Sequence, residues 1–254
     1  MQPLTEIQRE VLELYRASQF DKALAIVAPA LGKFPEDGRL WEIAGLIHRA
    51  TDNCAEALHA LEMATLLVPL SSAAQCALAD CYRSTEREDL AREMYQHLLT
   101  RMVQLPNVLL ENLAFGLESV GEVRSALRVS QEAARRQPTS ARNQYLTAYF
   151  MTQVGCTSEA VAEWAKKAVQ LAPEETEYRI GLSGLVHQSG HIEEAYDYVK
   201  ELTIADLREI PCGKCLRRLA ELYETFDDKL RQMACLGEIE RRIAQNDMED
   251  CGGC

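Results

Sequence analysis

Apolar residues recur along the chain at a nearly constant interval. Six alanines share one position of this pattern: Ala23, Ala57, Ala91, Ala126, Ala160 and Ala195. They are separated by 34, 34, 35, 34 and 35 residues. Four residues later, on the same face of a helix, stand mostly bulky side chains: Val27, Leu61, Tyr95, Ser130, Trp164 and Val199. A helical period of about 34 residues predicts stacked two-helix units, each too small to bury its apolar face alone.

Turn residues keep the same period. Gly121, Gly155 and Gly190 stand five residues before three of the alanines, where a tight turn between two helices favours glycine. The earlier units carry Ser18, Asp52 and Glu86 at that position. Prolines end most units: Pro35, Pro69, Pro138 and Pro173. Because Pro106 arrives late, we expect a longer connection in the third unit.

The period continues beyond the sixth alanine. Leu230 follows Ala195 by 35 residues, and residues 215–226 and 227–244 have the pattern of a seventh hairpin. Asp227 or Asp228 is the expected N-cap of its second helix. The charged residues near the end of this hairpin are typical of a terminal repeat, whose outer face meets water.

Composition narrows the functional classes. Of the 254 residues, 27 are Lys or Arg and 39 are Asp or Glu, and the formal net charge of −12 disfavours nucleic acid and anionic lipid as partners. No apolar stretch is long enough to predict a membrane span or a signal core. Nine cysteines form an odd set, and five of them are scattered singly through helical pattern. We therefore expect a soluble protein of a reducing compartment, the cytoplasm.

The second unit resembles the tetratricopeptide repeat (TPR) family. Trp41, Gly45, Ala57, Ala64 and Pro69 stand at the spacing of that family, and the resemblance covers about residues 4 to 205. It implies an all-α fold, a right-handed superhelical solenoid of six to seven antiparallel two-helix repeats. We expect about six units in residues 1–209 and a capping hairpin, closed by cysteines, in residues 210–254.

The resemblance also implies a partner-binding groove, lined by the first helix of each unit. The family's inward positions include Arg39, Glu42, Arg49, Arg83, Phe115, Arg142, Tyr145 and Tyr149. The arginines are suited to holding a carboxylate and the aromatic rings to anchoring a partner. Alternatively, the arginines form a solvated face paired with Glu42 and Asp80, and the rings pack between repeats.

Two Cys-x-x-Cys pairs frame the seventh hairpin. Cys212 and Cys215 precede it, and Cys251 and Cys254 follow it. Antiparallel folding brings both pairs to one end, where four thiolates form a structural zinc site. Nearby cations, Lys214, Arg217 and Arg218, would offset its negative charge. Iron in the same site, a redox-active pair and a tail of inactive thiols are the alternatives.

The motifs of catalysis are missing from the sequence. It has no phosphate-binding glycine loop, dinucleotide fingerprint, zinc-protease helix or nucleophile elbow. We therefore expect a non-enzymatic scaffold or adaptor that binds a protein or peptide, with a zinc-closed C-terminus. The alternative is a thiol-redox or metal sensor that uses the two cysteine pairs. The residue pattern does not determine the oligomeric state.

Overall fold

The computed structural model describes residues 4–245, which form fifteen α-helices and one 3₁₀ turn without a β-strand. Contacts divide the chain into unit 1, Met1–Val129, and unit 2, Ser130–Cys254. Unit 1 contains α1 (Leu4–Arg16), α2 (Phe20–Lys33), α3 (Gly38–Ala50), α4 (Cys54–Leu67), α5 (Ser72–Ser84), α6 (Glu88–Thr100), the 3₁₀ turn η1 (Met102–Gln104) and α7 (Asn107–Ser119). The boundary crosses α8 (Val123–Arg136). Unit 2 contains α9 (Ala141–Gln153), α10 (Ser158–Leu171), α11 (Thr176–Gln188), α12 (Ile192–Val199), α13 (Ile204–Glu209), α14 (Gly213–Thr225) and α15 (Lys229–Gln245).

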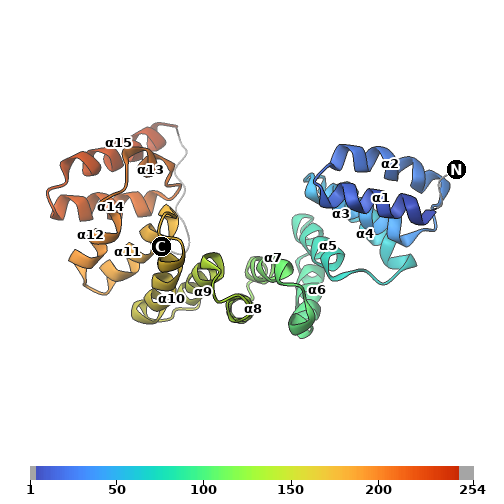
Figure 1. Ribbon diagram of the computed structural model, residues 1–254, viewed down its shortest axis with the longest axis horizontal. Helices are drawn as coiled ribbons and strands as arrows, with labels where there is room; N and C mark the ends of the chain where they lie inside the picture. Colours follow the sequence, from blue (N-terminus) through green and yellow to red (C-terminus); the bar gives the residue numbers. More distant parts are fainter. Residues whose placement is uncertain (1–3, 246–254) are drawn as a thin grey trace. The chain divides into compact units, whose positions relative to one another are not determined.

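Neighbouring helices pair as hairpins within each unit (Figure 1). The pairs in unit 1 are α1 with α2, α3 with α4 and α5 with α6, and those in unit 2 are α9 with α10, α11 with α12 and α14 with α15. All six predicted turn positions adopt a left-handed backbone: Ser18, Asp52, Glu86, Gly121, Gly155 and Gly190 have φ between 56° and 84°. The all-α fold of repeated hairpins is confirmed.

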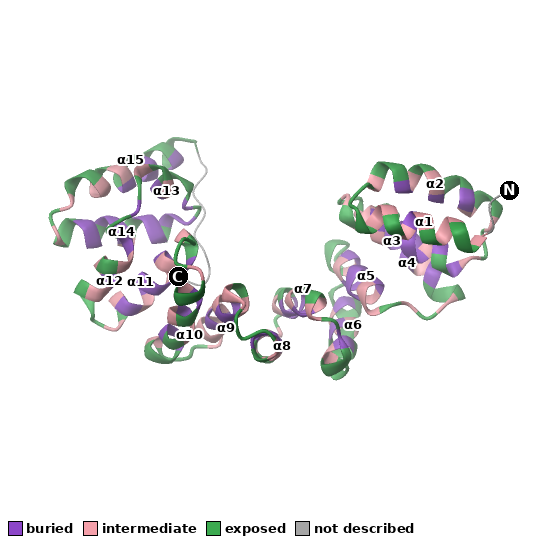
Figure 2. Ribbon diagram, in the orientation of Figure 1, coloured by how far each residue is buried: buried purple, intermediate pink, exposed green. Residues whose placement is uncertain are grey.

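The repeat alanines form the seam between the two helices of a hairpin. Ala23, Ala57, Ala91, Ala126 and Ala195 have no exposed surface, and helices such as α2 and α4 carry both buried and exposed residues (Figure 2). Small residues allow close approach here: a Cβ added to Gly45 would lie 2.5 Å from the Leu61 Cγ atom.

One alanine does not lie in the seam. Ala160 is exposed, whereas Val161 and Ala165 are buried. The reason is the N-cap of α10, Thr157, whose side chain accepts a hydrogen bond from the Ala160 N–H at 3.4 Å. This cap starts α10 three residues after Gly155, and the buried face moves by one residue. The expected seam position of Ala160 is therefore wrong, whereas Trp164 is partly buried and packs against the core of unit 2.

Consecutive repeats of unit 1 are joined by a recurring polar bond. The Gln8 amide donates to both carboxylate oxygens of Asp37, the N-cap of α3, at 3.0 and 2.8 Å. Thirty-four residues later, Glu42 Oε1 accepts from the backbone N–H of Ser71, the N-cap of α5, at 3.0 Å. In both cases, a side chain on the first helix of one repeat bonds to the N-cap residue of the first helix of the next repeat.

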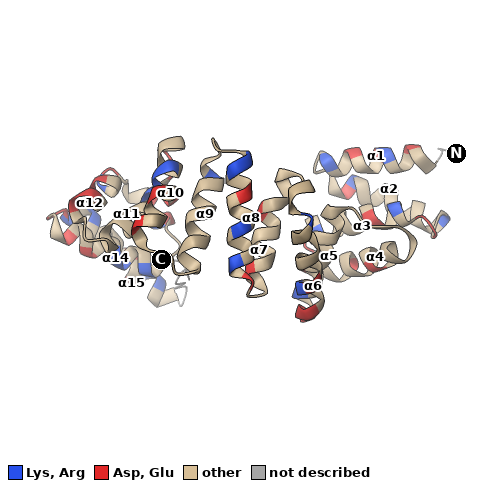
Figure 3. Ribbon diagram, turned by 90° about the horizontal axis from the view of Figure 1, so that it is seen from below, with Lys and Arg blue, Asp and Glu red and all other residues tan. Residues whose placement is uncertain are grey.

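The third connection is long, as Pro106 predicts. The 3₁₀ turn η1 and Leu105 lie between α6 and α7. Charged residues are spread over most helices, and α8 carries several arginines (Figure 3). Arg135 and Arg136 bind Glu132 at 2.8 and 2.7 Å, and hydrogen bonds from these two arginines lower the pKa of Glu132 to about 2.

The end of unit 2 departs from the repeat. Helix α12 has only eight residues and is followed by the short helix α13, which the sequence pattern did not predict. The seventh hairpin, α14 with α15, is present. Asp228 accepts from the Arg231 N–H at 3.3 Å, as an N-cap does, while Asp227 has the left-handed turn conformation. Leu230 is 70% exposed, so its expected equivalence to Ala195 is wrong.

No helix in the described part of the chain has the length and apolar character needed to cross a bilayer.

Candidate functional site

Three of the five predicted groove residues of unit 1, Arg39, Glu42 and Arg49, bond to neighbouring side chains or backbone in the same repeat or the next one. Glu42 is buried, and its Oε2 accepts from Arg39 at 2.6 Å while its Oε1 holds the next repeat. The Arg49 guanidinium lies 3.5 Å from the Asp80 carboxylate, which also accepts a 2.5 Å hydrogen bond from the Tyr95 hydroxyl. Burial, reinforced by Asp80, raises the pKa of Tyr95. Arg39 and Arg49 thus have the paired arrangement that the sequence offered as an alternative.

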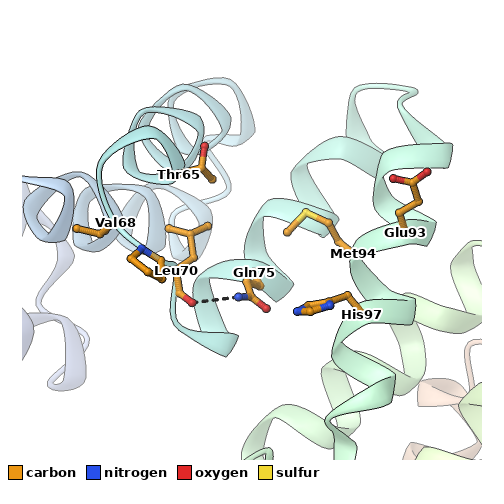
Figure 4. A pocket seen from close by; sticks show the side chains of 8 residues that line it. Thr65, Val68, Leu70, Gln75, Glu93, Met94 and His97 are labelled. Carbon is orange, nitrogen blue, oxygen red and sulfur yellow. Dashed lines mark hydrogen bonds between the residues drawn. The ribbon is translucent and has the colours of Figure 1, made fainter.

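The other two predicted residues of unit 1 reach solvent. Arg83 on α5 is exposed, and Phe115 on α7 is 37% exposed. A shallow pocket of about 330 Å³ also lies in unit 1, beside α4, α5 and α6 (Figure 4). It is lined by Thr65, Val68, Pro69, Leu70, Gln75, Glu93, Met94 and His97. The Gln75 amide donates to the Leu70 carbonyl at 3.0 Å, which ties α5 to the preceding loop.

The larger pocket, about 510 Å³, lies entirely in unit 2, and we call it the unit 2 pocket. The first helices of three hairpins, α9, α11 and α14, contribute to its wall, together with α10, α13 and the α13–α14 connection. Its lining residues are Tyr145, Ala148, Tyr149, Thr152, Val161, Ala165, Thr176, Glu177, Ile180, Gly181, Leu185, Gln188, Asp206, Glu209, Ile210, Pro211, Cys212, Cys215 and Arg218.

Two predicted aromatic residues form one wall of the unit 2 pocket. Tyr145 and Tyr149 are half-buried on α9. The Tyr145 ring packs against Tyr178 with centroids 4.5 Å apart, and its hydroxyl would lie 2.8 Å from a Cβ at Gly181. Burial, assisted by Glu177, raises the pKa of Tyr145, so its hydroxyl stays neutral. The third predicted residue of unit 2, Arg142, is exposed and does not line the pocket.

Helix α13 contributes Asp206 and Glu209 to the lining of the unit 2 pocket, and hydrogen bonds hold both of its ends. At its start, Thr203 and Asp206 form a capping box, with bonds of 2.7 and 3.2 Å. At its end, Arg242 of α15 donates to the carbonyls of Pro211 and Arg208 at 2.7 and 3.0 Å. These bonds fix the connection that carries Cys212.

The Arg242 side chain is in turn held by a buried carboxylate. It donates to Glu238 Oε1 at 2.6 Å, and both side chains are less than 10% exposed. Arg241, half-exposed, donates to both oxygens of the same carboxylate at 2.9 and 2.6 Å. Hydrogen bonds from Arg241 and Arg242 lower the pKa of Glu238 to about 2, against the opposing effect of its burial.

The first cysteine pair lines the unit 2 pocket. Cys212 is the N-cap of α14, and its Sγ accepts from the Cys215 N–H at 3.4 Å. Both residues are 5% exposed. Burial, followed by the bond to Cys212, raises the pKa of Cys215 to about 12. Cys251 and Cys254 lie outside the described residues, within which no three His, Cys, Asp or Glu side chains gather as metal ligands.

Arg218 is the one Lys or Arg among the described residues of the pocket lining. Its guanidinium lies over Gly184 of α11, where an added Cβ would be 2.5 Å from Nη1. Its Nη2 lies 3.7 Å from the Cys215 Sγ, and within residues 4–245 no carboxylate forms an ion pair with it. Sequence reasoning treated Arg218 only as an offset for a metal charge. Its place three residues after Cys215, on the same helical face, was the available signal.

Comparison with known proteins identifies the repeat. The profile of the tetratricopeptide repeat family matches residues 9–58 and 48–102. No curated protein matches the chain. A TPR protein fragment from Cytophaga hutchinsonii has a TM-score of 0.64 at 13% identity, over 91% of this chain and 93% of that one.

Two further solved structures show the same fold. MamA from Desulfovibrio magneticus has a TM-score of 0.56 at 17% identity, over 65% of this chain and 92% of its own. YrrB, described as a TPR protein with an unusual peptide-binding site, has a TM-score of 0.56 at 14% identity, over 69% of this chain and 93% of its own. The chain is an all-α repeat protein. Its N-terminal part, residues 9–102, carries tetratricopeptide repeats, and the solved structures extend the likeness of fold over most of the chain.

Proposed function

We propose that the chain is an interaction scaffold that binds a peptide segment of a partner protein in the unit 2 pocket. The observation that carries this proposal is the pocket itself, about 510 Å³ and built on the first helices of three hairpins. A concave apolar site with a few polar groups is the usual form of a binding site. The similarity to YrrB, a TPR protein with a peptide-binding site, supports the same class of ligand.

The lining indicates the chemistry of the ligand. Tyr149, Ile180 and Leu185 offer apolar area, and Arg218 offers a forked donor that suits a carboxylate. Glu177 and Glu209 are exposed acidic groups of the same lining, which disfavour additional negative charge. We infer a peptide that supplies one apolar side chain and one carboxylate close together, a combination that an apolar residue at a free chain end provides.

A peptide library displayed with free carboxyl termini tests this proposal. Selected peptides should end in an apolar residue and bind the full chain in a fluorescence anisotropy titration. Arg218→Gln should weaken them at least about tenfold, as expected when a charge-assisted bidentate pair is lost. Arg217→Gln, an exposed neighbour on α14, is the matched control. Equal losses in both variants, or selection of internal basic peptides, would refute the assignment.

We further propose that Cys212 and Cys215, together with Cys251 and Cys254, hold a structural zinc ion. The helix-capping Cys212 and the following turn of α14 place two thiols on one side of the chain. The anchored α13–α14 connection gives that pair a fixed position. A four-thiolate site leaves no position for a reacting water, so its role would be to close the last hairpin.

Elemental analysis of untagged protein tests the zinc proposal. We expect about one zinc per chain, lost in Cys215→Ser and retained in Cys156→Ser, which changes an exposed cysteine in the same unit. Zinc that survives Cys215→Ser would contradict the assignment. The redox alternative is less favoured, because Cys212 and Cys215 are both only 5% exposed and a redox-active pair needs thiols that an exchange partner can reach.

A further inference from the structure

Helix α15, the second helix of the last described hairpin, exposes a stripe of apolar residues. They are between 42% and 70% exposed, and their spacing places them on one face of the helix: Leu230, Met233, Leu236 and Ile243. The terminal repeat of an array normally turns a polar face to water. Two of the charged residues near the end of α15, Glu238 and Arg242, are buried instead. The open face of α15 is therefore apolar, which is typical of an interaction surface.

Earlier repeats show what covers this face. Met233 and Leu236 follow the left-handed turn residue of their hairpin by six and nine positions. In α4 the same two positions hold Leu58 and Leu61, which are 8% and 0% exposed. These leucines pack in one apolar cluster with residues on the first helix of the next repeat, α5: Ala74, Ala77, Leu78 and Cys81.

The same contact recurs in both units. Tyr196 of α12, at the sixth position, stacks on Phe226 at the end of α14, with ring centroids 4.2 Å apart. Tyr95 of α6, at the ninth position, has no exposed surface, and a Cβ added to Gly116 of α7 would collide with its ring. In each case the first helix of the next hairpin covers the second helix of the previous one. Helix α15 presents these positions to solvent.

We propose that α14 and α15 form a second interaction surface, which binds one amphipathic helix of a partner protein in the way that the array binds the first helix of a following repeat. The bound helix presents mostly small apolar residues with the i, i+3, i+4, i+7 spacing of the α5 residues. None of the four exposed apolar residues of α15 lines the unit 2 pocket, so the two surfaces are separate.

The start of α14 indicates how the bound helix begins. Arg217 is exposed and is the fifth residue of α14. The fifth residues of α1 and α3 are Gln8 and Glu42, which bond to the N-cap residue of the next first helix. A guanidinium donates hydrogen bonds, as the Gln8 amide does to the Asp37 carboxylate. An aspartate at the N-cap of the bound helix therefore fits Arg217.

The end of α14 carries the opposite charge. Glu224 is exposed and is the twelfth residue of α14. The twelfth residue of α3, Arg49, lies 3.5 Å from Asp80, which is the ninth residue of α5. Because the charge at this position of α14 is reversed, a lysine or arginine at the ninth position of the bound helix is complementary to it.

The first helix of a second copy does not fit this surface. The residues of α5 that face α4 are its third, sixth, seventh and tenth, and α1 has only charged residues at those positions: Glu6, Arg9, Glu10 and Glu13. Burying them against Met233 and Leu236 would be unfavourable. End-to-end stacking of this chain through α1 is therefore disfavoured, which favours a helix of a different protein.

A synthetic helix copied from α5 tests the proposal. The probe is a fluorescent peptide of residues 71–84, amidated so that it offers no terminal carboxylate to the unit 2 pocket, with four changes: Ser71→Asp, Cys76→Ala, Asp80→Lys and Cys81→Ala. It should bind the full chain in an anisotropy titration. Met233→Glu and Leu236→Glu should each weaken it at least about tenfold, because a charge would enter an apolar contact. Leu171→Glu, which changes a 43% exposed residue of α10, is the matched control.

Charge reversal tests the register of the bound helix. A second peptide keeps Asp80 and is otherwise identical to the probe. It should bind Glu224→Lys about two- to fivefold more tightly than the unaltered chain, as expected for an exposed ion pair, and the first probe should weaken by a similar factor. Arg218→Gln should leave the affinity of both peptides unchanged, which separates this surface from the unit 2 pocket.

Several results would overturn the proposal. These are the absence of probe binding to the unaltered chain, a loss in Leu171→Glu equal to that in Met233→Glu, and the same response of both peptides to Glu224→Lys. Dimers in sedimentation velocity that Met233→Glu dissociates would show that a second copy covers α15, and they would overturn the assignment to a partner helix. A chain that binds the probe but no peptide in the unit 2 pocket would retain this surface and lose the proposed function.

Discussion

Replacing Arg242 with methionine removes the residue that connects α15 to the end of α13. Three hydrogen bonds are lost: those to Glu238 and to the carbonyls of Pro211 and Arg208. A buried acceptor left unpaired costs about 1–3 kcal/mol, and breaking a buried ion pair costs about 3–5 kcal/mol. Because Glu238 keeps its ion pair with Arg241, we expect the free energy of unfolding to fall by about 3 kcal/mol, the lower end of the range for a broken buried ion pair. The destabilisation should be confined to unit 2.

The measurement combines urea unfolding with hydrogen exchange. In a repeat array, stability is a sum over units and their interfaces, so one global midpoint would hide a local effect. Exchange should therefore accelerate in α13, in the α13–α14 connection and in α15, and remain unchanged in α1–α4. The unit 2 pocket should lose peptide affinity in parallel, since α13 forms one of its walls.

Arg241→Met is the matched control, because Arg241 makes two bonds to the same Glu238 but is half-exposed. An exposed ion pair contributes about 0–1 kcal/mol. Equal destabilisation by the two variants, or a loss below about 1 kcal/mol in Arg242→Met, would refute the reasoning that burial and the two carbonyl bonds make Arg242 important.

Three further outcomes are expected. The pKa of Glu238 is lowered in the folded chain to about 2 from an ordinary 4.5. The ionised carboxylate therefore stabilises the folded chain fully above about pH 4.5, and this stabilisation is lost as the pH falls toward 2. Across that window, the urea midpoint of Glu238→Gln should decline less than that of the unaltered chain. Gly45→Ala should destabilise unit 1 by about 1–3 kcal/mol in thermal unfolding, because the new Cβ meets a leucine of α4. Gly32→Ala, whose new Cβ has nothing within 4 Å, should stabilise unit 1 by about 0.5–1 kcal/mol. Equal shifts in the two variants would contradict this reasoning. Gly184→Ala should displace the guanidinium of Arg218 and weaken selected peptides with little change in unfolding; undiminished binding would show that its position there is unimportant.

The fold could be predicted from the sequence because the same pattern of residues recurs in each repeat. Alanine in the seam and a left-handed residue five positions earlier recur together, and Ser18, Asp52 and Glu86 adopt that conformation although they are not glycine. The prediction was wrong at Ala160 because a single capping residue, Thr157, shifted the helix start. A period alone cannot show such a shift, since the alanine remains 34 residues from its predecessor.

The site was less predictable than the fold. The repeat positions predicted Tyr145 and Tyr149. They did not predict α13, which has no counterpart in the repeat, so its contribution to the pocket lining was missed. The Thr203 and Asp206 pair, spaced as a capping box, was the local signal for that helix. The role of Arg218 depends on its distance to Cys215 and its contact with Gly184, which only the folded chain shows.

The polar bonds that join consecutive repeats also bear on how the array opens. Gln8 holds Asp37, and Glu42 holds Ser71, so unwinding a first helix removes the support from the start of the next one. Fraying that begins at α1 should therefore weaken α3 before α3 itself unwinds. Unit 1 should therefore unfold repeat by repeat from α1, because each repeat that unfolds lowers the free-energy barrier to unfolding of the next one.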